Sequence, residues 1–311
     1  MAASINYADK VKQLFEKQLK EWPFLDSNYK DLNKIRLKRI EIYNFFINIQ
    51  FNPARIKSSA AKVDKQSIEN RACFLCFRPI EQKSVEFEDN FLILINPYPI
   101  FSKHLTIIHK EHVPQLIKEN FKWMLKLSKA LPEFTIFYNG PQSGASAPDH
   151  FHFQAGNKGA MPIESQIEVL KAQYSIAQTG STCKVWKIDD HIRRFILIES
   201  DNIIEIEAKF NEIYDKLAML KSYTNEPDMN ILCIYNITGW QVLIFPRGMH
   251  RPWQFNAQGD ENYIFSPASV DLGGLIILPL EKDFEKIDKH SVMDMMNQIG
   301  LSQEIFGQLH L

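Results

Sequence analysis

The stretch Asn139–Gln154, which reads NGPQSGASAPDHFHFQ, joins a glycine- and serine-rich loop to an alternating run of histidines and phenylalanines. Side chains alternate across a β-strand, so His150, His152 and Gln154 are expected on one face and the two phenylalanines on the other. The phenylalanine face suits a core and the histidine face suits a site. A lone histidine on a strand is more often a structural residue, but this spacing directly after such a loop favours chemistry.

The histidine face carries the groups needed for nucleophilic attack on phosphorus. A neutral imidazole is a competent nucleophile near pH 7, because its unperturbed pKa is about 6.5. Attack by His152 on an α-phosphorus would give a covalent nucleotidyl-histidine that a second acceptor discharges. Gln154 lies two residues further along the same face, where its amide could stabilise developing charge. The loop offers backbone N–H groups and hydroxyls of the kind that bind phosphate, and its candidate residues are Asn139, Ser143, Gly144 and Ser146.

The composition is that of a globular chain of enzyme size. Its 311 residues are 45% hydrophobic and 23% charged, and 36 Lys plus Arg nearly balance 37 Asp plus Glu. This balance excludes a strongly basic nucleic-acid footprint, and no apolar run approaches the ~18–20 residues of a membrane helix. The first residues carry frequent charges and no apolar segment, so they do not resemble a signal peptide. We expect a cytoplasmic protein without nucleic-acid or membrane partners.

Apolar periodicity predicts an α+β fold of mostly antiparallel sheets with flanking helices. Helices are expected over 6–22, 112–130 and 203–221, and strands at 39–45, 46–51, 91–95, 104–109, 135–138, 150–154, 195–198, 230–235, 241–245 and 275–278. The second half repeats the order of elements loosely, without a strict sequence repeat. We therefore expect two halves, 1–175 and 176–311, each built on such a sheet.

The segment His150-Phe-His152-Phe-Gln154 after Asn139-Gly140-Pro141-x-Ser143-Gly144-Ala145-Ser146 resembles the transferase branch of the histidine-triad superfamily. This branch contains the galactose-1-phosphate uridylyltransferases, the diadenosine tetraphosphate phosphorylases and the GDP-hexose phosphorylases. The loop is closest to the diadenosine tetraphosphate phosphorylases, whereas 150–155 followed by 161–164 is closer to the GDP-hexose phosphorylases. The resemblance covers roughly residues 50–165 and is fainter at 241–255 and 266–278.

The resemblance implies two histidine-triad-like halves, of which the second is degenerate. It assigns His152 as the nucleophile and Gln154 as the phosphate-stabilising residue, because in this branch a glutamine replaces the third histidine of the hydrolases. The implied reaction is nucleotidyl transfer or phosphorolysis of a nucleoside diphosphate-sugar or a dinucleoside polyphosphate. Inorganic phosphate or a sugar phosphate would be the acceptor, and no redox cofactor is needed. A nucleotide hydrolase of the same superfamily and a non-catalytic nucleotide-binding protein are the alternatives.

A Cys-x-x-Cys pair at Cys73 and Cys76 indicates a candidate metal site. Two thiolates with two imidazoles make a good tetrahedral zinc site. In the uridylyltransferases such a pair is completed by two histidines, and the resemblance implies a structural zinc held by Cys73, Cys76, His112 and His150. His109 or His104 could replace His112 as the ligand. Two buried reduced cysteines without a metal are the alternative interpretation.

Further substrate contacts are predicted outside the loop. The segment containing Arg55 and Lys62 resembles the nucleotide-contacting N-terminal segment of the branch, and these cations suit phosphate, although a solvated basic loop fits equally well. Asn96 ends a strand in an Asn-Pro-Tyr-Pro turn and, by resemblance, would lie against the nucleotide; an ordinary turn asparagine is the alternative. A basic and aromatic cluster could contact the second substrate or lie unpaired on the surface, and it comprises Arg247, His250, Arg251 and Trp253.

Overall fold

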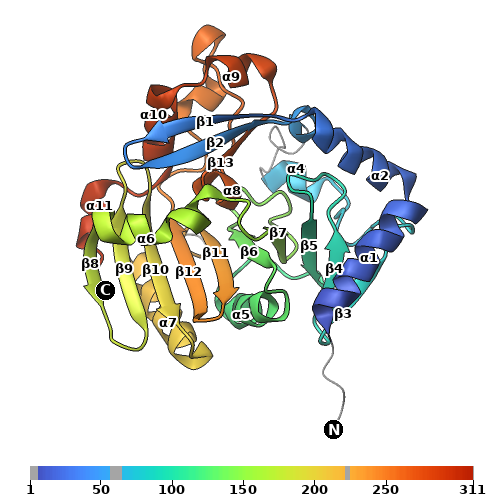
Figure 1. Cartoon of the computed structure of the whole chain (residues 1–311), viewed down its shortest axis with the longest axis horizontal. Helices are drawn as coiled ribbons and strands as arrows, with labels where there is room; N and C mark the ends of the chain where they lie inside the picture. The colour runs from blue at the N-terminus through green and yellow to red at the C-terminus, as the bar shows by residue number, and fades with distance from the viewer. Residues whose placement is uncertain (1–5, 57–64, 221–224, 311) are drawn as a thin grey trace.

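The structure, a computed structural model, describes residues 6–56, 65–220 and 225–310 and contains one large and one small β-sheet with flanking helices (Figure 1). The strands are β1 (Arg36–Ile42), β2 (Phe45–Phe51), β3 (Ser84–Phe87), β4 (Phe91–Ile95), β5 (His104–His109), β6 (Phe134–Asn139), β7 (His152–Asn157), β8 (Ser175–Thr179), β9 (Lys184–Asp189), β10 (Arg194–Ser200), β11 (Met229–Asn236), β12 (Gly239–Pro246) and β13 (Leu275–Leu278). The helices are α1 (Tyr7–Glu21), α2 (Pro23–Lys30), α4 (Lys65–Glu69), α5 (Phe121–Ala130), α6 (Pro162–Tyr174), α7 (Ile203–Leu220), α8 (Ser269–Leu272), α9 (Glu281–Lys286), α10 (Lys289–Ile299) and α11 (Gln303–Gln308).

The large sheet has ten strands in the order β3-β4-β5-β7-β6-β11-β12-β10-β9-β8, and every neighbouring pair is antiparallel. The boundary between β6 and β11 divides the sheet in two: β3 to β7 lie on one side of it and β8 to β12 on the other. The sheet therefore places two successive parts of the sequence side by side. The expected α+β class with mostly antiparallel sheets is confirmed.

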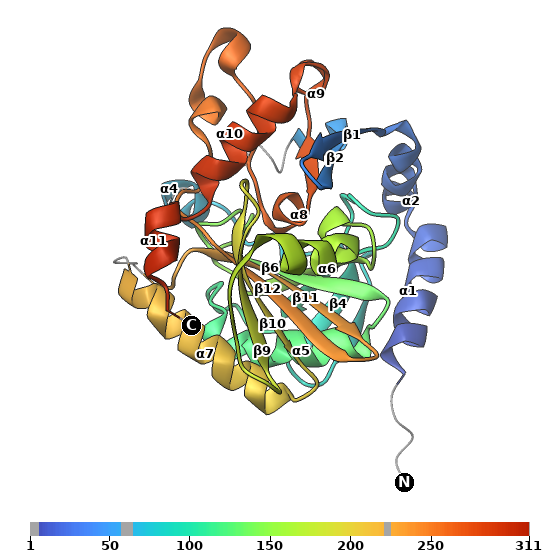
Figure 2. The same ribbon diagram turned by 60° about the vertical axis from the view of Figure 1, so that its left-hand side comes forward.

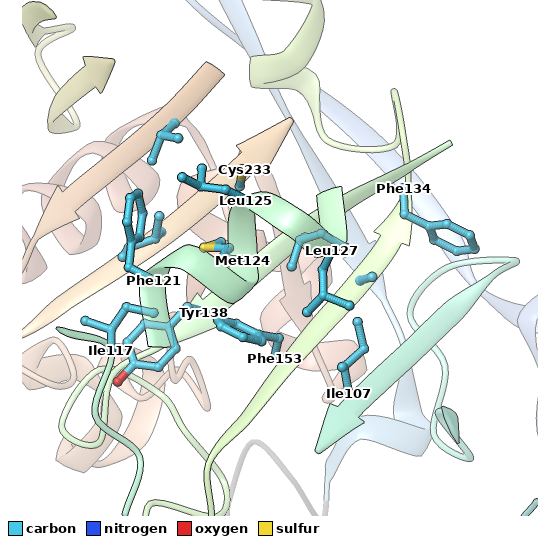
Figure 3. Close-up of a cluster of buried hydrophobic side chains, with 14 of the residues drawn as sticks. Ile107, Ile117, Phe121, Met124, Leu125, Leu127, Phe134, Tyr138, Phe153 and Cys233 are labelled. Carbon is cyan, nitrogen blue, oxygen red and sulfur yellow. The ribbon is translucent and has the colours of Figure 1, made fainter. Parts of the chain in front are cut away.

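One face of the large sheet is covered by α5 and α7, which pack on β6, β11 and β10 (Figure 2). Alternate residues of the central strands point to this face because side chains alternate along a strand. Figure 3 shows Phe121, Met124, Leu125 and Leu127 of α5 gathered with Tyr138, Phe153 and Cys233 of the strands. These side chains form one buried core that runs under both parts of the sheet.

The opposite face is covered differently in its two parts. Under β9 to β12, a second core includes α6, α8, α10 and the small sheet β1-β2-β13. In the small sheet β1 and β2 form an antiparallel hairpin, and β13 pairs with β2 in parallel. Under β4 and β5, a small cluster around Cys73 and Leu75 packs on Leu94 and Ile108. The face next to this cluster carries the site described below.

Several elements differ from the predicted ones. The helix expected over 112–130 begins only at Phe121. Pro114 disfavours the helical conformation of Val113, and the segment pairs with the chain before β7: Phe151 N donates to Val113 O and Gln115 N to Pro148 O. The strand expected at 150–154 begins at His152, since His150 N closes a turn onto Ala147 O.

Several further elements were not among those predicted, namely helices α2, α4, α6 and α8 to α11 and strands β3, β8 and β9. Helix α10 was missed although its buried residues, Val292, Met295, Met296 and Ile299, recur at helical spacing. In the part of the chain that the structure describes, no helix has the length and apolar character needed to cross a membrane.

Candidate active site

Strand β7 presents the histidine motif with alternating faces. Phe151 and Phe153 lie in the core, where both rings contact Phe91. His152 and Gln154 point to the opposite face and line a cavity of about 490 Å³. A cavity of this size can hold a nucleotide-sized ligand.

The cavity combines aromatic walls with a few polar groups. Its aromatic lining residues are Trp22, Phe24, Phe74, Phe77 and Tyr98. Three of the predicted substrate-binding residues also line it, namely Arg55, Asn96 and Ser146. Flat apolar side chains beside a cation and amides suit a ligand that carries both a ring and charged groups.

The Asn-Pro-Tyr-Pro turn holds two of these polar residues. Asn96 donates from Nδ2 to Thr106 Oγ1 over 2.9 Å, and its Oδ1 accepts from Tyr98 N over 2.9 Å. Arg55 donates from Nη1 to the Tyr98 carbonyl oxygen over 2.9 Å. The turn thus fixes both side chains at the rim of the cavity. Lys62, the other predicted cation, lies outside the described residues.

The hydrogen bonds of His152 define its tautomer. Its Nδ1 lies 2.9 Å from the carbonyl oxygen of His150, and a carbonyl can only accept, so Nδ1 carries the proton and Nε2 carries the lone pair. Burial lowers the pKa of His152 from 6.5 to about 4, so the ring is neutral at neutral pH. A buried neutral imidazole with an unprotonated Nε2 is arranged as a nucleophile.

His104 on β5 determines which way the amide of Gln154 faces. Its Nδ1 accepts from Ile100 N over 3.2 Å, so Nε2 carries the proton and donates to Gln154 Oε1 over 3.0 Å. Burial lowers the pKa of His104 to about 3, which keeps this donor neutral. With its oxygen held by His104, Gln154 has its NH₂ group available to an acceptor such as a phosphoryl oxygen.

The four predicted metal ligands, Cys73, Cys76, His112 and His150, form a cluster whose ligand atoms all lie within 4.8 Å of one another. His150 Nδ1 lies 3.4 Å from Cys73 Sγ and 3.2 Å from Cys76 Sγ. His112 Nδ1 lies 3.3 Å from Cys76 Sγ. Tetrahedral zinc with bonds of about 2.0–2.3 Å separates its ligand atoms by about 3.3–3.8 Å, so this set of donors fits zinc.

The surroundings of the cluster favour metal binding over chance proximity. His150 Nε2 lies 2.8 Å from the carbonyl oxygen of His109 and donates to it, which leaves Nδ1 directed at the thiols. The His109 ring itself contacts the backbone of Glu111, and His104 is engaged with Gln154. Neither alternative ligand belongs to the cluster formed by the described residues.

Asn139 lies at the contact between β6 and the C-terminal part of the chain. Its Oδ1 accepts from Ser269 N over 2.9 Å, from Ser269 Oγ over 2.7 Å and from Asn230 Nδ2 over 2.9 Å. The Oδ1 of Asn139 is thus engaged in joining these segments. Asn139 is not among the residues that line the described cavity.

Of the other predicted loop residues, some lie at the contact with the C-terminal part of the chain and one lines the cavity. Gly144 has a φ of +93° and comes so close to Ala268 that a Cβ at this position would lie 2.8 Å from that residue's Cβ. Ser143 is fully buried, and its Oγ has no hydrogen-bond partner within the described ranges. Ser146 lines the cavity, and its carbonyl oxygen accepts from Arg71 over 3.1 Å. Of the predicted loop residues, only Ser146 lines the described cavity.

The basic and aromatic cluster after β12 is largely structural. Arg247 is fully buried and donates to Asn230 Oδ1 and to the carbonyl oxygens of Pro267, Met249, His250 and Ile299. Arg251 donates to Ser266 Oγ and lies over the Phe255 ring. No member of this cluster lines the described cavity.

Two polar residues near the site had no distinct sequence signal. Arg71 lines the cavity and donates to Asp149 Oδ1 over 3.0 Å, and its position two residues before Cys73 is the only feature that could have marked it. Gln115 hydrogen-bonds the backbone of His152. It lies in the segment expected to be helical, so its contact with β7 was not foreseeable.

Comparison with known proteins covers both parts of the chain. Residues 14–157 match a domain of unknown function (DUF4922), and residues 167–311 match the GDPGP1-like C-terminal domain. The structure is similar to yeast Ap4A phosphorylase Apa2 in complex with Ap4A, with a TM-score of 0.63 and 16% identity over 94% of this chain and 98% of that chain. The complex of the same yeast enzyme with AMP gives a TM-score of 0.61 and 14% identity over 92% and 97%. No curated protein matches the chain significantly in sequence.

At this level of identity the likeness shows a shared fold, and it extends over nearly the whole of both chains. The chain has the fold of this phosphorylase, which confirms at the level of the fold the resemblance inferred from the histidine motif, because that resemblance includes the diadenosine tetraphosphate phosphorylases. More narrowly, residues 167–311 are similar to the GDPGP1-like C-terminal domain.

Proposed function

We propose that the protein is a nucleotidyltransferase or phosphorylase that works through a covalent nucleotidyl-histidine at His152. One observation carries the proposal: the unprotonated Nε2 of a neutral, buried His152 lies at a cavity beside Gln154, whose amide is held with its NH₂ group available. A nucleophile and an oriented donor on one strand face are the two groups that transfer of a nucleotidyl group needs.

The proposed reaction has two steps. His152 Nε2 attacks the α-phosphorus of the donor, an N–P bond forms, and the P–O bond to the leaving group breaks, so that the leaving group departs with the bonding electron pair. An oxygen of the acceptor then attacks the same phosphorus and releases His152 as a neutral imidazole. In both steps Gln154 donates to a phosphoryl oxygen, where negative charge increases.

The donor class follows from the site and from the relatives. We propose a nucleoside diphosphate-sugar or a dinucleoside polyphosphate, with inorganic phosphate or a sugar phosphate as acceptor. A ring bound on the aromatic walls and phosphates bound near Arg55 and Ser146 would fit the mixed lining of the cavity. The GDPGP1-like C-terminal domain and the fold of an Ap4A phosphorylase support these two donor classes.

We propose that the two predicted halves of the chain have different roles. Residues 1–175 would form the catalytic half, since they contain His152, Gln154 and the metal cluster, and residues 176–311 contain no H-x-H motif. Within the first half, Cys73, Cys76, His112 and His150 would hold a structural zinc. Zinc would supply a rigid anchor for the chain that enters β7, two residues before the nucleophile.

Mass spectrometry of the intact protein tests this function. The chain and His152→Ala would be incubated with GDP-mannose, GDP-glucose, UDP-glucose or diadenosine tetraphosphate, with phosphate withheld. We expect a mass increase of one nucleoside monophosphate in the wild type with one of these donors, and none in His152→Ala. An equal adduct in His152→Ala would refute the mechanism.

The acceptor separates the two reaction classes. Phosphate added to the labelled protein should remove the adduct and release a nucleoside diphosphate. Turnover at full rate without phosphate would instead identify a hydrolase. If no donor labels the protein and none is consumed, a non-catalytic nucleotide-binding role would replace the proposal.

A further inference from the structure

The pairing of β6 with β7 stops just before the proposed nucleophile. The two strands pair from Phe134 with Asn157 to Phe137 with Gln154. If the antiparallel register continued for two more residues, Asn139 would lie opposite His152. That pair does not form, although β6 keeps its pairing with β11 along its other edge, where Asn139 lies opposite Asn230.

The side chain of Gln115 occupies the place of the missing pair. Its Oε1 accepts from His152 N over 2.8 Å, and its Nε2 donates to the carbonyl oxygens of His152 over 2.9 Å and of Asn139 over 3.0 Å. The residue is 1% exposed, so water does not compete for these groups. A single amide thus satisfies both backbone groups of His152 and links them to β6.

Gln115 is itself held on both sides. Its N donates to Pro148 O over 3.2 Å, and its carbonyl oxygen accepts from Tyr138 Oη over 3.0 Å. The Tyr138 hydroxyl also contacts Glu226, which accepts a hydrogen bond from Ile117 N. The main chain of Gln115 is therefore held beside β7, and its side-chain amide is held by the three hydrogen bonds to His152 and Asn139.

We infer that Gln115 is a positioning residue that fixes the backbone of His152 and so aims its Nε2 into the cavity. The inference rests on the proposed function of His152. Nδ1 of the ring is tied to the His150 carbonyl two residues away, so the direction of the ring follows the local backbone. Misplacement of a reacting atom by about 1 Å can slow a reaction by about 10²-fold. Without the amide, the end of β7 that carries His152 has no partner on its β6 side.

The test compares two buried glutamines. Gln115→Met keeps the length of the side chain and removes its three hydrogen bonds. Gln166→Met makes the same substitution at a glutamine on α6 that is 6% exposed and whose side chain has one described hydrogen bond, to Phe46 O. We expect Gln115→Met to slow formation of the nucleotidyl-enzyme by about 10-fold or more at saturating donor. The donor concentration for half-maximal rate should change by less than about 2-fold. Gln166→Met should form the adduct at the wild-type rate, even if it lowers the melting temperature as much as Gln115→Met does.

Hydrogen exchange of the His152 amide gives a readout that does not depend on activity. Measured by NMR on protein labelled at its 9 histidines, this amide should exchange slowly in the wild type and in Gln166→Met and at least 10-fold faster in Gln115→Met. If Gln115→Met does not fold, Gln115→Glu replaces it, since a carboxylate keeps the acceptor for His152 N and loses both donors.

The outcomes separate the two proposals. A Gln115 variant that forms the adduct at the wild-type rate would overturn the positioning role and leave the proposed function intact. If the wild type forms no adduct with any donor, the proposed function fails, and unchanged protection of the His152 amide in the variant would then overturn the inference as well. A slower adduct together with faster exchange supports it.

Discussion

The two parts of the ten-stranded sheet are alike on one face and differ on the other. In β12, Val242 and Ile244 point into the core under α5 and α7, and Leu243 and Phe245 point into the second core. In β7, Phe153 points into the same first core, but the opposite face bears His152 and Gln154. Both are interior strands of one antiparallel sheet, so their backbone environments are similar.

The difference lies in what covers the second face. Below β9 to β12 the small sheet and helices α6, α8 and α10 bury aliphatic side chains. Below β4, β5 and β7 the cover is the short segment around Cys73 and Leu75, and a cavity is left beside it. A strand whose second face is covered contributes to stability, and a strand whose second face meets a cavity can present reactive groups. The predictions below test this distinction.

The largest difference is expected between His152→Ala on the cavity face and Leu243→Ala on the covered face. His152→Ala should lower the rate of nucleotidylation by at least about 10³-fold, with a loss of about 1 kcal/mol or less in the free energy of unfolding. Leu243 is fully buried opposite Leu197 and Leu232, so Leu243→Ala should lower that free energy by about 3 kcal/mol. Rates per folded molecule and urea unfolding measure the two effects. Comparable activity losses in both variants would contradict the distinction.

Removing the metal ligands should have the next largest effect. We expect the purified wild type to contain about one zinc per chain, and Cys73→Ser/Cys76→Ser to contain none. Loss of the anchor before β7 should lower the melting temperature by several degrees and slow nucleotidylation about 10-fold. Elemental analysis and thermal unfolding provide the measurements. Cys183→Ser, which alters a cysteine outside the cluster, is the control.

If the wild type contains no metal and the double variant melts at the same temperature, the cysteines are reduced thiols without a ligand role. The donor set predicts the other result, because two sulfur atoms and two imidazole nitrogens lie within 4.8 Å of one another and three of their separations are 3.2–3.4 Å, close to those in a tetrahedral zinc site.

A smaller effect is expected from His104→Leu. This change removes the donor that holds Gln154 Oε1, so the amide can rotate and present its oxygen to the phosphoryl group. We expect nucleotidylation to slow by about 3-fold, which is less than for loss of a direct donor. In a Gln154→Ala background, His104→Leu should lower the rate of nucleotidylation little further, and a double-mutant cycle measures this. Additive losses would place His104 in a separate role.

Local signals explain what could be predicted from the sequence. The alternation in 150–154 and the cysteine pair are local, so the candidate nucleophile, Gln154 and the two cysteines could be named from the residues, whereas His112 and His150 were implied as metal ligands by the family resemblance. The strands at 91–95 and 104–109 were predicted at the residues where they occur, because apolar side chains recur in each over a few positions.

What could not be predicted depends on contacts between distant segments. The loop pattern predicts phosphate contact for Asn139, but only the fold shows that Ser269 and Asn230 converge on its Oδ1. Trp22, near the N-terminus, reaches the cavity because α1 packs beside β3 and β4. The role of Gln115 could not be predicted, because apolar periodicity in 112–130 indicates a helix. In the structure, a proline and backbone pairing keep residues 112–117 out of that helix.

The smallest effect is expected from Glu226, which lies at the boundary between the two parts of the sheet, here called the seam. Glu226 is 4% exposed and accepts from Tyr138 on β6 and from Ile117 N. Burial raises the pKa of Glu226 from 4.5 to about 7, although the hydrogen bonds from Tyr138 and Ile117 oppose the shift. Below pH 4.5 the carboxyl is protonated in both folded and unfolded chains. Between pH 4.5 and 7 the unfolded chain ionises first, so the contribution of Glu226 to stability is lost as the pH rises.

Glu226→Gln should therefore flatten the pH dependence of unfolding. Between pH 5 and 7.5 the wild type should lose roughly 1–3 kcal/mol of unfolding free energy relative to Glu226→Gln, measured in urea at each pH. Glu119→Gln, a change at an exposed glutamate two residues after Ile117, should follow the wild-type curve. Parallel curves for wild type and Glu226→Gln would mean that the seam tolerates an ionised carboxylate. The Glu226–Tyr138 contact would then not hold β6 in place. The main chain of Gln115 would be held by Tyr138 and the Pro148 carbonyl alone.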